Sequence, residues 1–330
     1  MTAERRLRAW LRLSLCRSIG ARTWNHWLIE IEGAGLTIED FLDLPEYEAR
    51  PFLANWPQIA HALRQETPPS SALDHIQARL DREKTRLVPI NDPHYPGRLL
   101  TDLGLDAPTF LCVSGRLSHL HAPTMAMVGT RSPSPLGEAS ARAYAGALAR
   151  RGIHIVSGQA RGIDTAAHEG ALAGGGSTTL VLPCGFFSFT MPPHLRRLAT
   201  HDNTLILSQF PPDAPTSRYS PTVRNTIIAA LADGLVVAEA RLKGGPAYAF
   251  REARHMHKPL WTVIYPEPAP ASASGNHSLL SAGAEPLEPG EAGAENCVAA
   301  MVRGLREAHA GRPEPTRWPP RENPNQGELF

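Results

Sequence analysis

Cysteine is scarce in this chain of 330 residues, and the four cysteines are scattered. Cys16, Cys112, Cys184 and Cys297 form no C-x-x-C pair and have no histidines at the spacing of a zinc site. We therefore expect no metal centre. The cysteines are interpreted as core thiols of a protein from the reducing cytoplasm.

Long hydrophobic runs are also missing. Five arginines interrupt the apolar N-terminus between residues 5 and 17, which excludes a signal peptide or a membrane span there. A charge excess of one sign is absent too, because 33 basic residues balance 32 acidic residues to a net charge of +1. We expect a cytoplasmic protein without membrane contact, and any nucleic-acid surface on it must be local.

Lysine is rare, since Lys84, Lys243 and Lys258 are the only lysines among the 33 basic residues. The arginine fork binds phosphate better than the lysine ammonium does. A GC-rich genome is nevertheless the commoner cause of such a bias.

The length exceeds one typical core and predicts two domains and a tail. Apolar residues recur at helical spacing from Leu7 to Leu15 and from Trp24 to Ile31, which predicts a small helical domain over residues 1–75. A second domain is expected over 76–290 and a short helix over 291–310. The Pro-rich residues 311–330 are expected to be a disordered tail.

Short β-rich runs alternate with helical runs from residue 86 onward. Runs such as 124–128 and 234–238 are apolar throughout, as is typical of strands buried on both faces. The alternation predicts an α/β domain with a doubly wound, mostly parallel sheet. The expected strands are 86–90, 109–113, 124–128, 153–157, 178–183, 204–208, 234–239 and 259–264, with helices near 135–151, 163–173, 222–232 and 246–256.

Two glycine-containing turns follow expected strands at the carboxyl edge of this sheet. Glycines let backbone amides approach an anion, and the N-terminus of the following helix favours negative charge. Tight connections need glycine for steric reasons as well, but an arginine in each turn strengthens the phosphate-site hypothesis. The candidate residues are Gly129, Thr130, Arg131 and Ser132 in the first turn and Ser157, Gly158, Arg161 and Gly162 in the second.

Two further segments are expected at the same edge. Arg224 and Asn225 are predicted in the first turn of a helix, where a cation is unfavourable unless an anion or a carboxylate compensates it. Lys243 and Gly244 provide another glycine turn with a cation. Asp164 is predicted to cap a helix and to be structural, because an acid in the pocket would repel phosphate.

Several enzyme classes lack their motifs here. No G-x-x-x-x-G-K-[ST] is present for a P-loop, and the first turn is not the G-x-G-x-x-G of nicotinamide enzymes. His255 and His257 have no third ligand nearby in the sequence. We predict no catalytic residue and no cofactor, and thus a protein that is not an enzyme.

In combination and in order, these segments resemble the DprA/Smf family of DNA-processing proteins, over roughly residues 86–284. The resemblance implies an extended Rossmann-like domain that binds single-stranded DNA, forms a homodimer and loads the RecA recombinase. It also places Arg131, Arg224 and the glycine turns in a phosphate-binding pocket, and Arg196 and Arg197 fit the family pattern. Residues 4–64 are similar in placement to its helical module, of the SAM or helix-hairpin-helix type. The matching segments are 92–96, 129–133, 157–168, 224–229 and 275–280.

Two alternatives remain open. The turn at 244–246 lacks the hydroxyls usual in the family, so a DprA-like component of an anti-phage defence or toxin–antitoxin system is a rival. A nucleotide N-glycosidase of the lysine-decarboxylase-like fold is the other, although Glu252 lies one residue too far along for the P-G-G-x-G-T-x-x-E motif.

The C-terminal residues Gln326, Leu329 and Phe330 resemble the Q-x-x-L-F peptides that bind the bacterial sliding clamp. An apolar pair on a tail that does not fold would be explained by a partner pocket. The alternative is that Leu329 and Phe330 pack onto the protein's own sheet or onto a dimer mate.

Overall fold

The computed structural model describes residues 3–312 and 316–319. Within these ranges no helix has the length and hydropathy of a membrane span. Gln326, Leu329 and Phe330 lie outside the described residues, so the clamp-peptide hypothesis stays a prediction.

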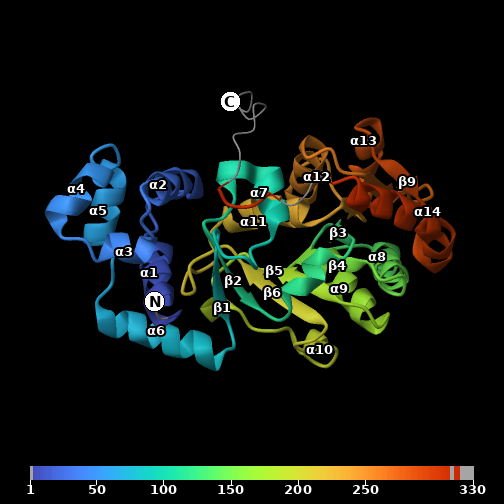
Figure 1. Cartoon of the computed structure of the whole chain (residues 1–330). Coiled ribbons are helices and arrows are strands. Elements are labelled where there is room, and N and C mark those ends of the chain that lie inside the picture. Colours follow the sequence, from blue (N-terminus) through green and yellow to red (C-terminus); the bar gives the residue numbers. More distant parts are fainter. Residues whose placement is uncertain (1–2, 313–315, 320–330) are drawn as a thin grey trace.

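The N-terminal part is a helical unit, drawn in blue in Figure 1. Trp24, Trp27, Leu28 and Ile31 recur at helical spacing and are all buried on one side of the second helix, as the periodicity predicts. The helices are α1 (Ala3–Leu15), α2 (Ala21–Gly33), α3 (Ile38–Leu42), α4 (Glu46–Leu53) and α5 (Pro57–Gln65).

Helix α6 (Ser70–Arg82) leads from this unit into the sheet. Pro69 forms its N-cap, so the helix begins directly after the Pro-Pro pair. The domain boundary expected at residue 75 therefore falls inside a helix and not in a loop.

After α6 the chain forms a nine-stranded sheet, with the strands in the order β1-β2-β6-β5-β4-β3-β7-β8-β9. The strands β6, β5, β4, β3, β7, β8 and β9 run parallel to one another, whereas β2 is antiparallel to both β6 and the edge strand β1. The predicted α/β class with a doubly wound, mostly parallel, Rossmann-like sheet is confirmed. The strands are β1 (Arg86–Pro89), β2 (Phe110–Ser114), β3 (Thr124–Val128), β4 (His154–Gly158), β5 (Thr178–Val181), β6 (Thr204–Ser208), β7 (Gly234–Val237), β8 (Leu260–Val263) and β9 (Glu285–Leu287).

Helices cover both faces of the sheet (Figure 1). The side chains of β3 alternate, so that Met125 and Met127 pack on one face while Ala126 and Val128 pack on the other. The first face is covered by α8 (Pro135–Ala149), α9 (Ile163–Ala173) and α14 (Gly290–Ala310), and the second by α7 (Gly97–Leu103), α11 (Ser220–Leu231) and α12 (Gly245–His255). The smaller elements are α10 (Pro193–Arg196), α13 (Asn276–Ser281) and the 3₁₀ turns η1 (Gly104–Asp106), η2 (Leu117–His121), η3 (Phe186–Ser188) and η4 (Ala271–Ala273).

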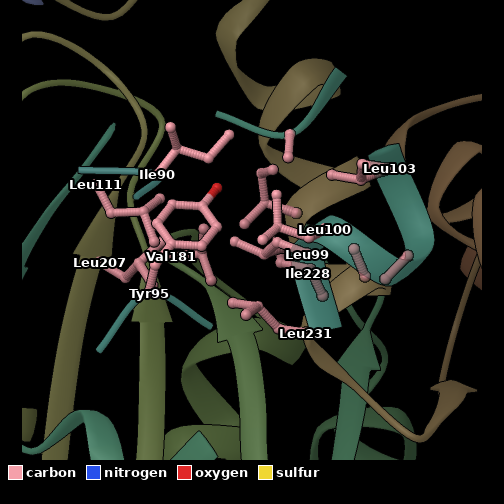
Figure 2. Packing of buried hydrophobic residues seen from close by; sticks show 14 of the residues in the cluster. Ile90, Tyr95, Leu99, Leu100, Leu103, Leu111, Val181, Leu207, Ile228 and Leu231 are labelled. Carbon is pink, nitrogen blue, oxygen red and sulfur yellow. The ribbon is translucent and has the colours of Figure 1, made fainter. Parts of the chain in front are cut away.

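Figure 2 shows the core between the second face of the sheet and its helices. Leu99 and Leu100 of α7 and Ile228 of α11 point toward Val181 and Leu207 of the central strands. This packing fixes α11 along the sheet, and the N-terminal half of α11 carries candidate binding residues.

The segment after residue 311 differs from the expected disordered tail in its described part. The Nε of Arg312 pairs with Asp233 at 2.8 Å, and the backbone N–H of Thr316 donates to Thr101 Oγ1 at 3.2 Å. The indole N–H of Trp318 donates to Glu32 of α2 at 2.5 Å. The short helix expected over 291–310 is the 21-residue α14.

Candidate nucleic-acid interface

A pocket of about 600 Å³ lies at the carboxyl edge of the parallel strands. It is bounded by the loop after β3, the loop after β7 and the segment that leads into α11. The first turns of α11 and α12 both line it, so two positive helix ends face the same space. We call this the anion pocket. Eight predicted residues line it, namely Gly129, Thr130, Arg131, Ser132, Arg224, Asn225, Lys243 and Gly244.

The turns after β3 and β4 approach each other so closely that two positions need glycine. A Cβ on Gly129 would lie 2.4 Å from the side chain of Ile163. Gly162 has a φ of +80°, and a Cβ there would lie 2.5 Å from the carbonyl oxygen of Thr130. That same carbonyl accepts a hydrogen bond from the N–H of Ile163 at 3.2 Å. Gly162 thus joins the two turns and does not itself line the pocket.

The predicted position of Arg224 is wrong. Helix α11 begins at Ser220, so Arg224 lies in the second turn, where its side chain is only 4 % exposed. Its Nη1 donates to the carbonyl of Val181 at 3.2 Å and lies 3.6 Å from Asp164 Oδ2. Arg224 is therefore a buried, paired cation at the base of the pocket and not an arginine on a surface turn.

Asp164 also differs from its expected role, because it pairs with Arg224 instead of capping a helix. Gly162 is the N-cap of α9, and no side chain accepts a hydrogen bond there. Asp164 lines the anion pocket with its carboxyl group almost fully buried. Burial raises the pKa of Asp164 to about 6, while the charges of Arg224 and Arg131 act in the opposite direction.

The other cations of the anion pocket are exposed. Within the described ranges, the side chains of Arg131, Arg241 and Lys243 make no hydrogen bond or ion pair to the protein, so their charges are available to a ligand. Arg218 stacks on the ring of Tyr219 at 4.5 Å. Counting Arg224, five cations face one carboxylate among the described lining residues. The pocket is therefore suited to anions.

A second cavity of about 370 Å³ adjoins the anion pocket and shares Arg131, Ala160 and Thr216 with it. Gly158 and Arg161 line this second cavity and not the first. Its other walls include Leu180, Pro183, Pro192 and Leu195. A ligand longer than one phosphate can thus extend from the anion pocket past Arg131 into a more apolar space.

Besides Gly162, three predicted residues line neither cavity. Ser157 is fully buried, and its hydroxyl donates to the carbonyl of Met127 at 2.6 Å, so its predicted contact with nucleic acid is wrong. Arg196 lies in α10 and donates to the carbonyl of Met191 at 3.1 Å. Arg197 is exposed just after α10 and lines neither cavity.

Sequence reasoning missed several residues that the fold brings to the anion pocket. Thr216, Ser217, Arg218 and Arg241 line it. Next to them, the side chains of Tyr219 and Leu242 are 60 % and 65 % exposed. The sequence signal that could have indicated them is the run of hydroxyl residues and the aromatic Tyr219 just before the helix that carries Arg224.

The side chains considered for a metal site and for a glycosidase do not gather at the anion pocket. No group of three or more metal-ligating side chains occurs in the described part of the chain. Glu252, the residue considered for a glycosidase, accepts a hydrogen bond from Thr226 at 3.4 Å and does not line the anion pocket.

Residues 86–297 match the model of the family described as DNA recombination-mediator protein A. The chain belongs to this family. Curated relatives include protein Smf of Escherichia coli, 34 % identical over 218 residues, and a putative DNA processing protein DprA of Mycobacterium tuberculosis, 34 % identical over 246 residues. These matches cover 66 % and 69 % of this chain but only 58 % and 62 % of those relatives.

Solved structures agree with this placement. DNA processing protein A of Streptococcus pneumoniae superposes with a TM-score of 0.66 at 26 % identity, over 83 % of this chain and 92 % of that one. DNA processing protein A of Helicobacter pylori gives 0.55 at 27 % identity, over 67 % and 96 %. The latter structure concerns a single-stranded DNA binding mode of that protein.

Proposed function

We propose that this recombination-mediator family member binds single-stranded DNA in the anion pocket. The observation that carries the proposal is the pocket itself, where five cations and two helix N-termini face one buried carboxylate. Such an arrangement stabilises a backbone phosphate through arginine contacts and the positive ends of two helices together. The single-stranded DNA binding of the Helicobacter pylori relative supports the same ligand class.

The surroundings of the pocket favour a single strand over a duplex. Tyr219 and Leu242 expose an aromatic ring and an apolar side chain beside the cations, and unpaired bases stack on aromatic rings. The second cavity beyond Arg131 offers a recess for the next part of the strand. Unlike a stiff duplex, a flexible backbone can place a phosphate inside a pocket with its bases splayed out.

We further propose a role in recombination, which the family supports. The family description, DNA recombination-mediator protein A, supports the proposal that the bound strand is handed to a recombinase such as RecA. We propose the homodimer, the cytoplasmic location and the absence of catalysis on the same ground. The defence or toxin–antitoxin role remains the alternative for the biological setting, and the neighbouring genes would distinguish the two.

The test is the substitution Arg131→Ala. Arg131 is exposed, has no hydrogen bond or ion pair to the described protein and lies between the two cavities. Its loss should weaken binding of a fluorescent oligothymidine and lower the slope of log K against log salt by about 0.7, the value for one phosphate contact on a single strand. Thermal stability should not change.

The matched control is Arg303→Ala, which removes an exposed arginine from α14 on a different surface. It changes the net charge equally and should leave affinity and slope close to wild type. If Arg131→Ala binds like Arg303→Ala across the salt titration, the anion pocket is not the DNA site.

A further inference from the structure

A second buried carboxylate lies close to the anion pocket without lining it. Glu239 follows β7 and is 0 % exposed. Its Oε2 accepts a hydrogen bond from the backbone N–H of Ser134 at 2.9 Å, and its Oε1 accepts a short one from the Ser134 hydroxyl. No cation pairs with Glu239 in the described residues. A buried charge of this kind is tolerated only where hydrogen bonds satisfy it.

The same contact organises the start of α8. The Ser134 hydroxyl, while it donates to Glu239, accepts a hydrogen bond from the N–H of Gly137 at 2.9 Å and thereby caps the helix. A Cβ on Gly137 would lie 2.1 Å from Glu239 Oε1, so the missing side chain leaves the space that the carboxylate occupies. The positive end of α8 further favours the charge.

Glu239 also contacts the first residue of the loop 130–134, which precedes α8. Its backbone carbonyl accepts a hydrogen bond from the N–H of Thr130 at 2.8 Å. One residue therefore fixes Thr130 through its main chain and Ser134 through its side chain. Arg131 and Ser132, which lie between these two anchors, line the anion pocket with exposed side chains.

We propose that Glu239 is a positioning residue for DNA binding, which holds the loop of residues 130–134 so that Arg131 is presented to a phosphate. This inference rests on the proposed function. Glu239 is absent from the lining of both cavities, so it acts on the ligand only through the loop. A preordered loop loses less conformational entropy on binding than a loop that must first be ordered.

A carboxylate suits this place better than a neutral amide does. Both acceptor oxygens of Glu239 face donors of Ser134. Glutamine has the same shape but can satisfy the Ser134 N–H only by turning its NH₂ group toward the Ser134 hydroxyl, which must then accept a second hydrogen bond and loses the acceptor for its own proton. Glu239→Gln therefore loosens the loop without creating a cavity.

The experiment is a double-mutant cycle between Glu239→Gln and Arg131→Ala, read as oligothymidine affinity across a salt titration. Glu239→Gln alone should weaken binding about three- to tenfold, as expected for one lost hydrogen bond. Combined with Arg131→Ala it should weaken binding no further, because the loop acts through Arg131. Ser134→Ala, which removes only the hydroxyl, is the second variant if Glu239→Gln folds poorly.

Glu252→Gln is the matched control, since Glu252 lies on α12 outside both cavities. The inference is overturned if Glu239→Gln and Ser134→Ala lower only the melting temperature, or if the losses in affinity with Arg131→Ala are additive. Failure of the proposed function looks different, because Arg131→Ala itself would then bind like wild type.

Discussion

At the scale of single residues, burial determines what a charged side chain in the anion pocket can do. Arg224 and Asp164 are both almost completely buried and lie 3.6 Å apart. Burial lowers the pKa of Arg224, and the neighbouring Asp164 carboxylate counteracts this effect. Much of the charge of Arg224 is thus compensated within the protein, and the exposed Arg131 is the better candidate for a direct phosphate contact.

The raised pKa of Asp164 predicts a pH-dependent stability. Its pKa of about 6 in the folded state exceeds the ordinary value of 3.8, so between these values the folded state binds more protons than the unfolded state. The contribution of Asp164 to the free energy of unfolding therefore falls as pH rises from about 4 to 6 and is constant above that. Asp164→Asn should remove this part of the dependence.

The measurement is urea unfolding of wild type and Asp164→Asn at several pH values between 4 and 8. The difference between their free energies of unfolding should change below about pH 6 and level off above it. A difference that stays constant across the whole range would show that Asp164 has an ordinary pKa in the folded protein.

At the scale of helices and strands, most of the sheet domain could be predicted from the sequence. Its inner strands are apolar runs between glycine turns, and β3 and β6 have the expected bounds. Helices α7 and α13 and strand β9 were not predicted, because seven, six and three residues are too few to show a period.

The start of α11 explains the main error at the candidate site. A helix was expected from residue 222, whereas Ser220 begins it and Pro221 occupies the first turn. Two residues are enough to move Arg224 from the first turn to the second and to bury it. Its partner Asp164 is 60 residues away in the sequence, and no local pattern identifies such a pair.

The C-terminal end of α11 likewise depends on contacts that no local sequence pattern indicates. Its last carbonyls accept hydrogen bonds from Lys258 at Ala229 and Ala230 and from Arg98 at Leu231, and Arg312 donates to the carbonyl of Ala232. Cations at a helix C-terminus are favourable. These three come from distant segments, so the sequence could not reveal that they cap one helix.

The turn after β4 provides a test at this scale. A Cβ on Gly158 would lie 1.3 Å from Arg224 Nη1 and 2.5 Å from Asp164 Oδ2. Gly158→Ala should therefore displace the buried ion pair and lower the free energy of unfolding by about 1–3 kcal/mol or more. Gly304→Ala in α14 is the control, since its Cβ would meet only Trp261 at 3.8 Å.

Urea unfolding should show changes of opposite sign in the free energy of unfolding of the two variants. Alanine stabilises a helix interior relative to glycine by roughly 0.5–1 kcal/mol, so Gly304→Ala should match or exceed wild type. A Gly158→Ala protein as stable as wild type would mean that the guanidinium of Arg224 does not occupy the space beside Gly158.

At the scale of the whole molecule, polar contacts join the helical unit to the sheet domain. Buried Asn25 of α2 donates to the carbonyls of Leu105 and Ala107 at 2.9 and 2.8 Å. Arg17 pairs with Asp213 at 2.7 Å, on the segment that leads toward the anion pocket. An arginine of the helical unit thus pairs with a carboxylate of the sheet domain. The two units also share one hydrophobic cluster.

The C-terminal segment adds a third connection. Glu32 of α2 accepts hydrogen bonds from Asn91 Nδ2 at 2.7 Å and from the indole N–H of Trp318. Trp318 packs half-buried against the shared hydrophobic cluster. Residues from the two ends of the chain and from the loop after β1 therefore meet at one glutamate.

This meeting point predicts that Trp318 stabilises the molecule as a whole. Trp318→Ala removes half-buried aromatic surface and a hydrogen bond to a carboxylate, and should lower the free energy of unfolding by about 1–3 kcal/mol. Arg317→Ala changes the exposed neighbouring residue and should have almost no effect. Urea unfolding of both variants, followed by far-UV circular dichroism, makes the comparison. Equal midpoints for the two variants would mean that the indole of Trp318 contributes nothing to stability in solution.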